Sequence, residues 1–318
     1  MQLRAFSVPW FIGEPYELLT LPFLKLSLLV DYHVLFNIPD GLAATINWVP
    51  YYQPDDYDFA ILHLDIDCID PRLPNCRKRQ LYLELDEIIQ EIPKVVIVHG
   101  TPRSPLHLDR EEARRRLNGL VRGNHVVVAS EANMRFWGRG DVIVPGMITD
   151  EWLDLAKEPR IVTAVPLDGL PRASYEFLEA VRIGLAANDV ILCHIGINYI
   201  PANNETRRDY LASSLIYLAP KTNYAYQEDI LRAMLCGCCV ISGPHPVGED
   251  ALPVRSNCVM AAEDAPQAVA LATQLLNNPE RAIRMGKECK MNARQLLDWG
   301  RYLRDWETHL SRILGNHV

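Results

Sequence analysis

The segment SLIYLAPKTNYAYQEDILRAMLCGCCVISGPHPVG, residues 214–248, decides which fold the sequence predicts. Its apolar run 215–220 is typical of a buried strand, and the pattern over 227–235 predicts a helix after a polar connection. A second apolar run, 238–243, follows one tight turn at Gly237. A strand, a helix and a strand in this order are typical of a parallel βαβ unit.

The same alternation continues on both sides of this segment. We expect further strands at 190–196 and 257–262, and helices at 207–213, 249–252, 267–276 and 279–297. Asp264 and Pro266 suit the start of one of these helices, because aspartate caps helix N-termini and proline fits the first turn. The second half of the chain therefore resembles a Rossmann-type domain.

The first half predicts another α/β domain. Apolar runs at 3–9, 59–64, 95–98 and 126–129 are typical of buried strands, and most end in a polar or glycine-containing turn. The pattern breaks at 144–150, where we expect a hinge. We therefore predict an N-terminal domain at 1–152, a second domain at 153–298, and a helix within 299–318 that returns to the first domain. A cleft between two such domains is the expected ligand site.

Composition excludes several classes of protein. The chain has 318 residues, of which 49% are hydrophobic and 23% charged, enough to build two cores. Its formal net charge of −8 opposes a main role in binding nucleic acid, so we expect no nucleic-acid partner. No stretch approaches the run of about 20 apolar residues in a membrane-spanning helix, because Pro22 and Lys25 interrupt 18–30.

The eight cysteines indicate a compartment. Several lie in apolar, strand-like runs, and the first residues lack the pattern of a secretory signal. We expect a cytoplasmic protein whose contact with a membrane, if it has one, is peripheral. The sequence predicts no oligomeric state.

A helix that starts after a parallel strand can bind phosphate. Its first backbone N–H groups lack partners, and its dipole favours negative charge there. The connection 221–227 occupies this position in the sequence. An ordinary crossover with no ligand is the alternative.

Several short motifs stand out in the second half. They are Leu231-Arg232-Ala233-Met234, Cys236-Gly237-Cys238, Val240-Ile241-Ser242 and Asn278-Pro279-Glu280-Arg281. With Pro220 and Met285-Gly286, they resemble the donor domain of retaining GT-B glycosyltransferases of family 4. Residues 58–63, 95–100 and 142–152 resemble other parts of that family more loosely. The resemblance implies two Rossmann-like domains that face each other across a cleft, with no cofactor and no required metal.

The resemblance also implies a binding site for a nucleotide diphosphate sugar. The donor-binding residues are then Gly13, Arg172, Thr222, Asn223, Tyr224, Ala225, Tyr226 and Arg232. In the family, two glutamates eight positions apart flank the loop, and they correspond here to Tyr224 and Arg232. Both carboxylates are therefore missing, although a tyrosine can stack on the donor and an arginine can bind ribose or phosphate oxygens.

The resemblance implies individual roles for four residues. Arg172 matches one of two family cations on the diphosphate, while Leu167 replaces the other. His99, after the strand at 95–98, and Glu249 are the expected catalytic residues near the transferred sugar. Gly13 would let the backbone approach the diphosphate. A solvated Arg172 and a structural His99 are the alternatives.

Three other signals compete with this interpretation. Asp65-Ile66-Asp67 follows a strand, as does the metal-binding acidic pair of GT-A enzymes. Cys236, Cys238 and Cys239 suggest zinc, although core packing explains them better. The arginine-rich stretch 110–116 is either a self-paired, solvated helix or a basic patch for a lipid surface or an acidic acceptor.

We therefore predict a hexosyltransferase that moves a sugar from a nucleotide diphosphate sugar to an acceptor hydroxyl of unknown identity. The resemblance implies retention of anomeric configuration and a role in polysaccharide or glycoconjugate synthesis. Two alternatives are an inactive GT-B-like partner of an active transferase and a sugar-nucleotide epimerase.

Overall fold

The chain folds into two compact units. The computed structural model describes residues 2–8, 18–30, 46–100, 109–153, 155–165, 170, 172–195, 204–220, 228–243 and 259–315. Unit 1 comprises residues 1–147 and 299–318, and unit 2 comprises residues 148–298. The boundary after Met147 lies in the segment 144–150, where the sequence pattern breaks.

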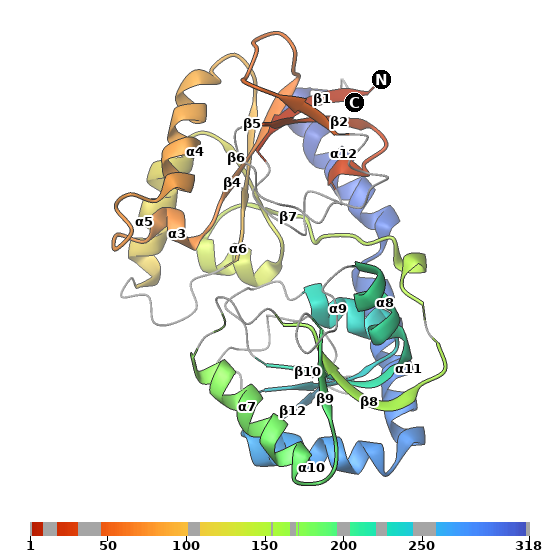
Figure 1. Cartoon of the computed structure of the whole chain (residues 1–318). Coiled ribbons are helices and arrows are strands. Elements are labelled where there is room, and N and C mark those ends of the chain that lie inside the picture. The colour runs from red at the N-terminus through yellow and green to blue at the C-terminus, as the bar shows by residue number, and fades with distance from the viewer. Residues whose placement is uncertain are drawn as a thin grey trace. The chain divides into compact units, whose positions relative to one another are not determined.

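Unit 1 contains a seven-stranded parallel sheet (Figure 1). The strands are β1 (Leu3–Ser7), β2 (Leu24–Leu29), β3 (Asn47–Val49), β4 (Phe59–Leu64), β5 (Lys94–Val98), β6 (His125–Val128) and β7 (Asp141–Val142). Their order is β3-β2-β1-β4-β5-β6-β7, so the direction of winding reverses between β1 and β4. Ligands of open α/β sheets bind beyond the carboxyl ends of the strands at such a reversal.

Helices cover both faces of this sheet. They are α3 (Ile66–Ile69), α4 (Arg77–Ile88), α5 (Arg110–Val121), α6 (Glu131–Trp137) and α12 (Trp299–Leu314). Alternate strand residues point to opposite faces. On one face, Leu62 and Val96 pack with residues of α4, α5 and α6. On the other, Ile61 and Val95 pack with Trp306 of α12.

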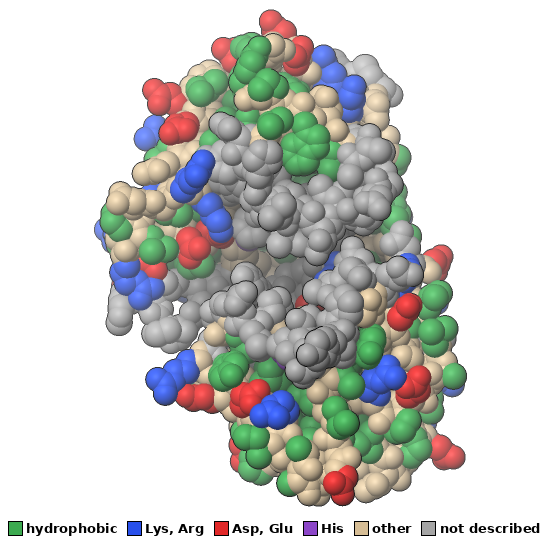
Figure 2. All heavy atoms as spheres, viewed as in Figure 1, with side chains coloured by type: hydrophobic (Ala, Val, Ile, Leu, Met, Phe, Trp, Pro, Cys, Tyr) green, Lys and Arg blue, Asp and Glu red, His purple; other side chains and the backbone are tan. Residues whose placement is uncertain are grey.

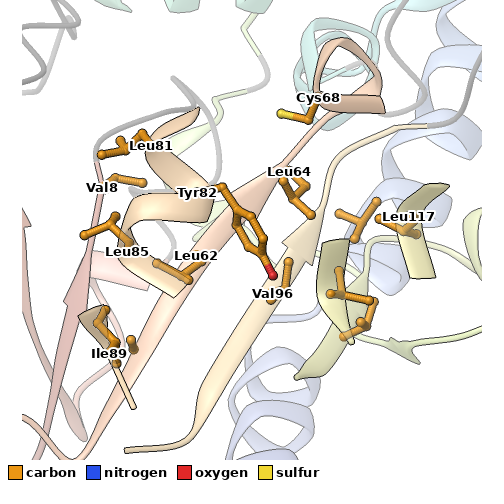
Figure 3. Close-up of a cluster of buried hydrophobic side chains, with 14 of the residues drawn as sticks. Val8, Leu62, Leu64, Cys68, Leu81, Tyr82, Leu85, Ile89, Val96 and Leu117 are labelled. Carbon is orange, nitrogen blue, oxygen red and sulfur yellow. The ribbon is translucent and has the colours of Figure 1, made fainter. Parts of the chain in front are cut away.

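The core under α4 shows how a single aromatic side chain joins helix and sheet. The ring of Tyr82 lies among Leu62, Leu64 and Val96 (Figure 3). Its hydroxyl accepts a hydrogen bond from the side-chain amide of Asn124 at 3.0 Å. The buried phenol is thereby satisfied, as buried polar groups require.

Unit 2 contains a parallel sheet that has fewer strands than the sheet of unit 1, with helices on both faces. Its strands are β8 (Glu158–Thr163), β9 (Leu192–His194), β10 (Ser214–Ala219), β11 (Cys239–Ser242) and β12 (Val259–Ala261), in the order β12-β11-β10-β8-β9. Its helices are η1 (Thr149–Glu151), α7 (Arg172–Ala186), α8 (Asn204–Ser213), α9 (Glu228–Leu235), α10 (Ala265–Leu276) and α11 (Pro279–Leu296). The two parallel sheets confirm the predicted α/β class.

The helix start predicted from Asp264 and Pro266 is confirmed, and α11 begins in a similar way. The Asp264 carboxylate accepts from the N–H of Gln267 at 2.8 Å and caps α10. Asn278 accepts from the N–H of Arg281 at 3.2 Å and caps α11, with proline in its first turn. Within the described ranges, no helix has the length and apolarity needed to cross a bilayer.

Other elements differ from the expectation. The sequence pattern does not predict β8, because Glu158, Pro159 and Arg160 interrupt its apolar character. It also does not predict β2, β3 and β7. The helix expected at 249–252 and the first two residues of the strand expected at 257–262 lie outside the described residues.

Candidate functional site

Three polar side chains meet near the carboxyl edge of the unit 1 sheet. Ser7 is the last residue of β1, His63 the second-last residue of β4, and His99 the first residue after β5. The strand register pairs His63 with Ile97, so His99, two residues further on, shares the face of His63. Ser7 and His63 lie on β1 and β4, between which the winding of the sheet reverses, and His99 directly follows β5, the next strand.

A chain of short contacts joins the three side chains. Oγ of Ser7 lies 3.2 Å from Nε2 of His63, and Nδ1 of His63 lies 2.9 Å from Nε2 of His99. The two rings stack with their centroids 5.1 Å apart and their planes 24° apart. Ser7 and His63 are 1% and 2% exposed, whereas His99 is only partly buried. A polar chain therefore runs from the interior to His99.

Burial controls the charge of the central histidine. Desolvation first, and the neighbouring His99 second, lower the pKa of His63 well below its usual value. His63 is therefore a neutral imidazole near pH 7, with one nitrogen that donates and one that accepts.

The backbone around His99 is held on two sides. The N–H of His99 donates to the carbonyl of Leu64 at 2.8 Å, which extends the pairing of β4 and β5 by one residue. Gly100 has φ of 69°, a left-handed conformation that suits glycine, and its carbonyl accepts from Nε1 of buried Trp137 at 2.9 Å. The strand end therefore presents His99 in a defined position. Its catalytic role stays a prediction.

Asp65 and Asp67 contact other groups of the fold, whereas the acidic pair of a GT-A enzyme binds a metal ion. The Asp65 carboxylate accepts from the N–H of Cys68 at 3.2 Å and caps α3, and it forms an ion pair with Lys78. Asp67 lies 4.0 Å from the same ammonium group. Among the described residues, no group of three or more His, Cys, Asp or Glu side chains could hold a metal ion.

The cysteines that suggest zinc lie in the core of unit 2. Cys236, Cys238 and Cys239 are fully buried. The thiol of Cys238 donates to the carbonyl of Leu211 at 3.1 Å. These contacts support core packing.

The arginine-rich stretch forms α5, and much of its charge is used internally. Glu112 forms ion pairs with Arg115 and Arg116, as the spacing predicts. Arg114 donates to the carbonyls of Arg135 and Phe136 at the end of α6, both at 2.6 Å. On the face drawn in Figure 2, basic and acidic side chains are intermixed.

Arg232, which stands at the place of the family's second glutamate, is largely enclosed within unit 2. Its side chain is 14% exposed, and its Nη1 lies 3.7 Å from the Asp229 carboxylate. Its guanidinium carbon lies 5.2 Å from the centre of the Trp152 ring. Arg207 approaches the same Asp229 oxygen at 3.7 Å. These contacts give Arg232 a structural role, and its ribose contact stays a prediction.

Arg172 has the opposite environment. It is the first residue of α7, its side chain is 92% exposed, and its Nε donates to Glu176 at 2.7 Å. The guanidinium is solvated and can bind an anion. Such binding would break only an exposed ion pair, which contributes little to stability. The diphosphate contact stays a prediction.

The remaining predicted site residues lie outside the described residues. They are Gly13, Thr222, Asn223, Tyr224, Ala225, Tyr226 and Glu249. The strand β10 ends at Ala219 and α9 begins at Glu228, so five of them belong to the connection between these two elements. Sequence reasoning missed His63 and Ser7.

No protein-family model matches the chain, and no curated protein matches it in sequence. Solved structures do match it. HepE from Anabaena, in complex with UDP and glucose, matches with a TM-score of 0.70 at 12% identity, over 98% of this chain and 100% of that one. The same protein in complex with UDP-glucose matches with a TM-score of 0.66.

Two further structures match over almost their whole length. Sucrose-phosphate synthase from Thermosynechococcus elongatus has a TM-score of 0.65 at 13% identity, over 98% of this chain and 99% of that one. A glycosyltransferase from Rickettsia africae has a TM-score of 0.66 at 12% identity, over 99% of both chains. With two parallel α/β units and this likeness along nearly its full length, the chain has the GT-B fold.

Proposed function

We propose that this protein is a glycosyltransferase that moves a sugar from a nucleotide diphosphate sugar to an acceptor hydroxyl. The observation that carries the proposal is the position of His99. It stands at the carboxyl edge of the unit 1 sheet of a GT-B fold, and a buried hydrogen-bonded chain holds its ring. The complexes of HepE with UDP and with UDP-glucose favour a uridine donor.

In the proposed reaction, unit 2 binds the donor and unit 1 supplies groups near the sugar. The connection 221–227, Arg172 and Arg232 contact the nucleotide, and negative charge that grows on the departing diphosphate is stabilised by Arg172. In this proposal His99 and Glu249 act on the transferred sugar, and Gly13 lets the backbone approach the diphosphate. We further propose retention of configuration, with the donor phosphate assisting deprotonation of the acceptor hydroxyl on the same face.

A second candidate function is that of a non-catalytic partner of an active transferase. One observation favours it: Arg232 replaces a donor-binding carboxylate and is engaged with Asp229 and Trp152 within unit 2. In this case the fold would bind another protein or a glycan without turning over a donor.

Product analysis separates these functions. The protein is incubated with UDP-glucose, and in parallel with GDP-, ADP- and dTDP-linked sugars, with and without a mixture of alcohol and oligosaccharide acceptors. A transferase releases nucleoside diphosphate faster when acceptors are present, and NMR of the product gives its anomeric configuration. Addition of EDTA should leave the rate unchanged, because the proposal needs no metal.

Two results contradict the proposal. Conversion of the sugar nucleotide into an epimer without any acceptor assigns the protein as an epimerase. Absence of both release and epimerisation, with every donor, favours the non-catalytic partner. The variant His99→Asn serves as the matched control, since it should lose turnover while keeping the fold.

A further inference from the structure

We infer that His63 is a positioning residue for His99. One proton shared between the two imidazole rings keeps both rings in the same tautomer. The tautomer itself can be measured without any substrate. Its consequence for turnover rests on the proposed function.

The first step is a count of protons between the rings. At 2.9 Å, Nδ1 of His63 and Nε2 of His99 need one hydrogen between them, since two N–H groups or two lone pairs repel at that distance. A neutral imidazole has only one N–H. If His63 supplies the proton from Nδ1, then His99 must carry its own on Nδ1. If His99 supplies it from Nε2, then His63 carries its own on Nε2. The two rings therefore always share a tautomer.

The second step concerns Ser7. Its hydroxyl lies 3.2 Å from Nε2 of His63 and can either donate to a bare nitrogen or accept from an N–H. Ser7 therefore satisfies the buried ring in both states. Ser7 and His63 are almost fully buried. Loss of the contact with Ser7 would leave Nε2 of His63 desolvated and without this hydrogen bond, and that cost keeps the ring in place.

The third step shows what the pair does for His99. Burial keeps His63 a neutral imidazole, so its Nδ1 meets His99 either as one N–H or as one lone pair. Because Nε2 of His99 is engaged in this contact at 2.9 Å, the state of Nε2 determines whether Nδ1 of His99 carries the proton of the neutral ring. The hydrogen bond made by one ring nitrogen sets the state of the other.

The test is a nitrogen NMR measurement on protein with 15N-labelled histidine. Two-bond proton–nitrogen spectra distinguish a protonated ring nitrogen from a bare one. At pH 8 we expect His63 and His99 to show the same tautomer. Opposite tautomers in the unmodified protein would overturn the inference, and this result needs no variant.

Three variants test the coupling. His63→Phe keeps an aromatic ring and removes both nitrogens, so the nitrogen signals of His99 should shift from those of the unmodified protein. His63→Asn keeps an amide near the position of Nδ1, so its His99 signals should lie closer to those of the unmodified protein than the signals in His63→Phe do. Ser7→Ala should change the signals of His63. Identical His99 signals in His63→Phe and in the unmodified protein would contradict the inference.

Ser27→Ala is the matched control. Ser27 is also a buried serine, on the strand β2 beside β1, and its hydroxyl accepts from the amide of Asn47 at 2.8 Å. Its loss should leave the signals of both histidines unchanged.

Turnover gives an independent measurement. If the protein transfers sugar, His63→Phe should lower kcat by about tenfold or more and change its pH profile, with KM for the donor unchanged. If the unmodified protein turns over no donor, the proposed function fails. The NMR spectra still decide the inference about His63 in that case.

Discussion

Gly286 in α11 packs directly against the carbonyl oxygen of Gly237, the residue at the turn between α9 and β11. A Cβ atom on Gly286 would lie 2.0 Å from this oxygen, far inside van der Waals contact. Gly237 itself has φ of 74°, which suits glycine. The close approach of these two backbones therefore positions α11 against the turn that follows α9, the helix after the predicted donor loop.

The variant Gly286→Ala should be less stable than the unmodified protein. Alanine favours a helix over glycine by about 1 kcal/mol, but overpacking against backbone costs about 1–3 kcal/mol or more. We expect a net loss, measured as a lower thermal midpoint. Glu288→Ala, at an exposed position of the same helix, should not lower the midpoint. An unchanged midpoint in Gly286→Ala would show that the helix can move away.

Arg172→Ala should weaken donor binding and leave stability unchanged. The side chain is 92% exposed and its ion pair with Glu176 lies on the surface, so the fold does not depend on it. If Arg172 contacts the diphosphate, loss of one charge-assisted contact should raise the Kd for UDP about tenfold.

Arg182→Ala is the matched control for this experiment. Arg182 lies on the same helix, is 51% exposed and pairs with Glu179, as Arg172 pairs with Glu176. Its loss should leave the Kd for UDP unchanged. Equal Kd values for both variants and the unmodified protein would remove Arg172 from the donor site.

Arg232→Ala should lower the stability of unit 2. The substitution removes a cation from the Trp152 ring and one of two arginines that face Asp229. Because the site is largely buried, we expect a loss of about 1–2 kcal/mol in the free energy of unfolding, with a smaller loss in Arg232→Lys. Urea denaturation followed by the fluorescence of Trp152 and the other tryptophans measures it. An unchanged free energy of unfolding in Arg232→Ala would contradict this structural role, whereas loss of UDP binding would support the proposed contact of Arg232 with the nucleotide.

His309 in α12 should make stability depend on pH. Its side chain is 3% exposed. Burial, the largest cause, together with Arg312 on α12 and His125 on β6, lowers its pKa from 6.5 to about 4, while Asp141 on β7 opposes the shift. The unfolded chain therefore binds a proton that the folded chain does not. This contribution to stability is present above about pH 6.5 and is lost as the pH falls toward 4, by up to about 3 kcal/mol.

The measurement is the thermal midpoint between pH 7.5 and 4.5, compared with that of His309→Phe. Burial also lowers the pKa values of His63 and His194, so both add to the slope in the unmodified protein. The variant should show a shallower decrease than the unmodified protein. Parallel curves would mean that His309 does not titrate as its burial requires.

Much of the fold follows from apolar runs. The runs 59–64 and 95–98 predict β4 and β5 because parallel strands covered on both faces have continuous apolar sequences. The strand β8 has only three consecutive buried residues, and Pro159 lies near its start. Pairing with β10 and β9, which are distant in sequence, forms this strand. Local pattern does not contain that information.

The candidate site was predictable in part. His99 follows a strand and precedes a glycine, which marks a strand end where ligands bind. His63 lies inside the apolar run FAILHL, where a histidine resembles a core residue. The signal that could identify it is the register of β4 and β5, which places His63 and His99 on one face. Register depends on tertiary pairing, so a single sequence does not supply it.

The most direct test of the central claim is calorimetric titration of the whole protein with UDP-glucose and with UDP, GDP, ADP and dTDP. A sugar-nucleotide transferase should bind one of these nucleoside diphosphates, and its sugar conjugate, with a stoichiometry of one per chain. Glucose alone should bind far more weakly. An absence of heat with every nucleotide would contradict the account.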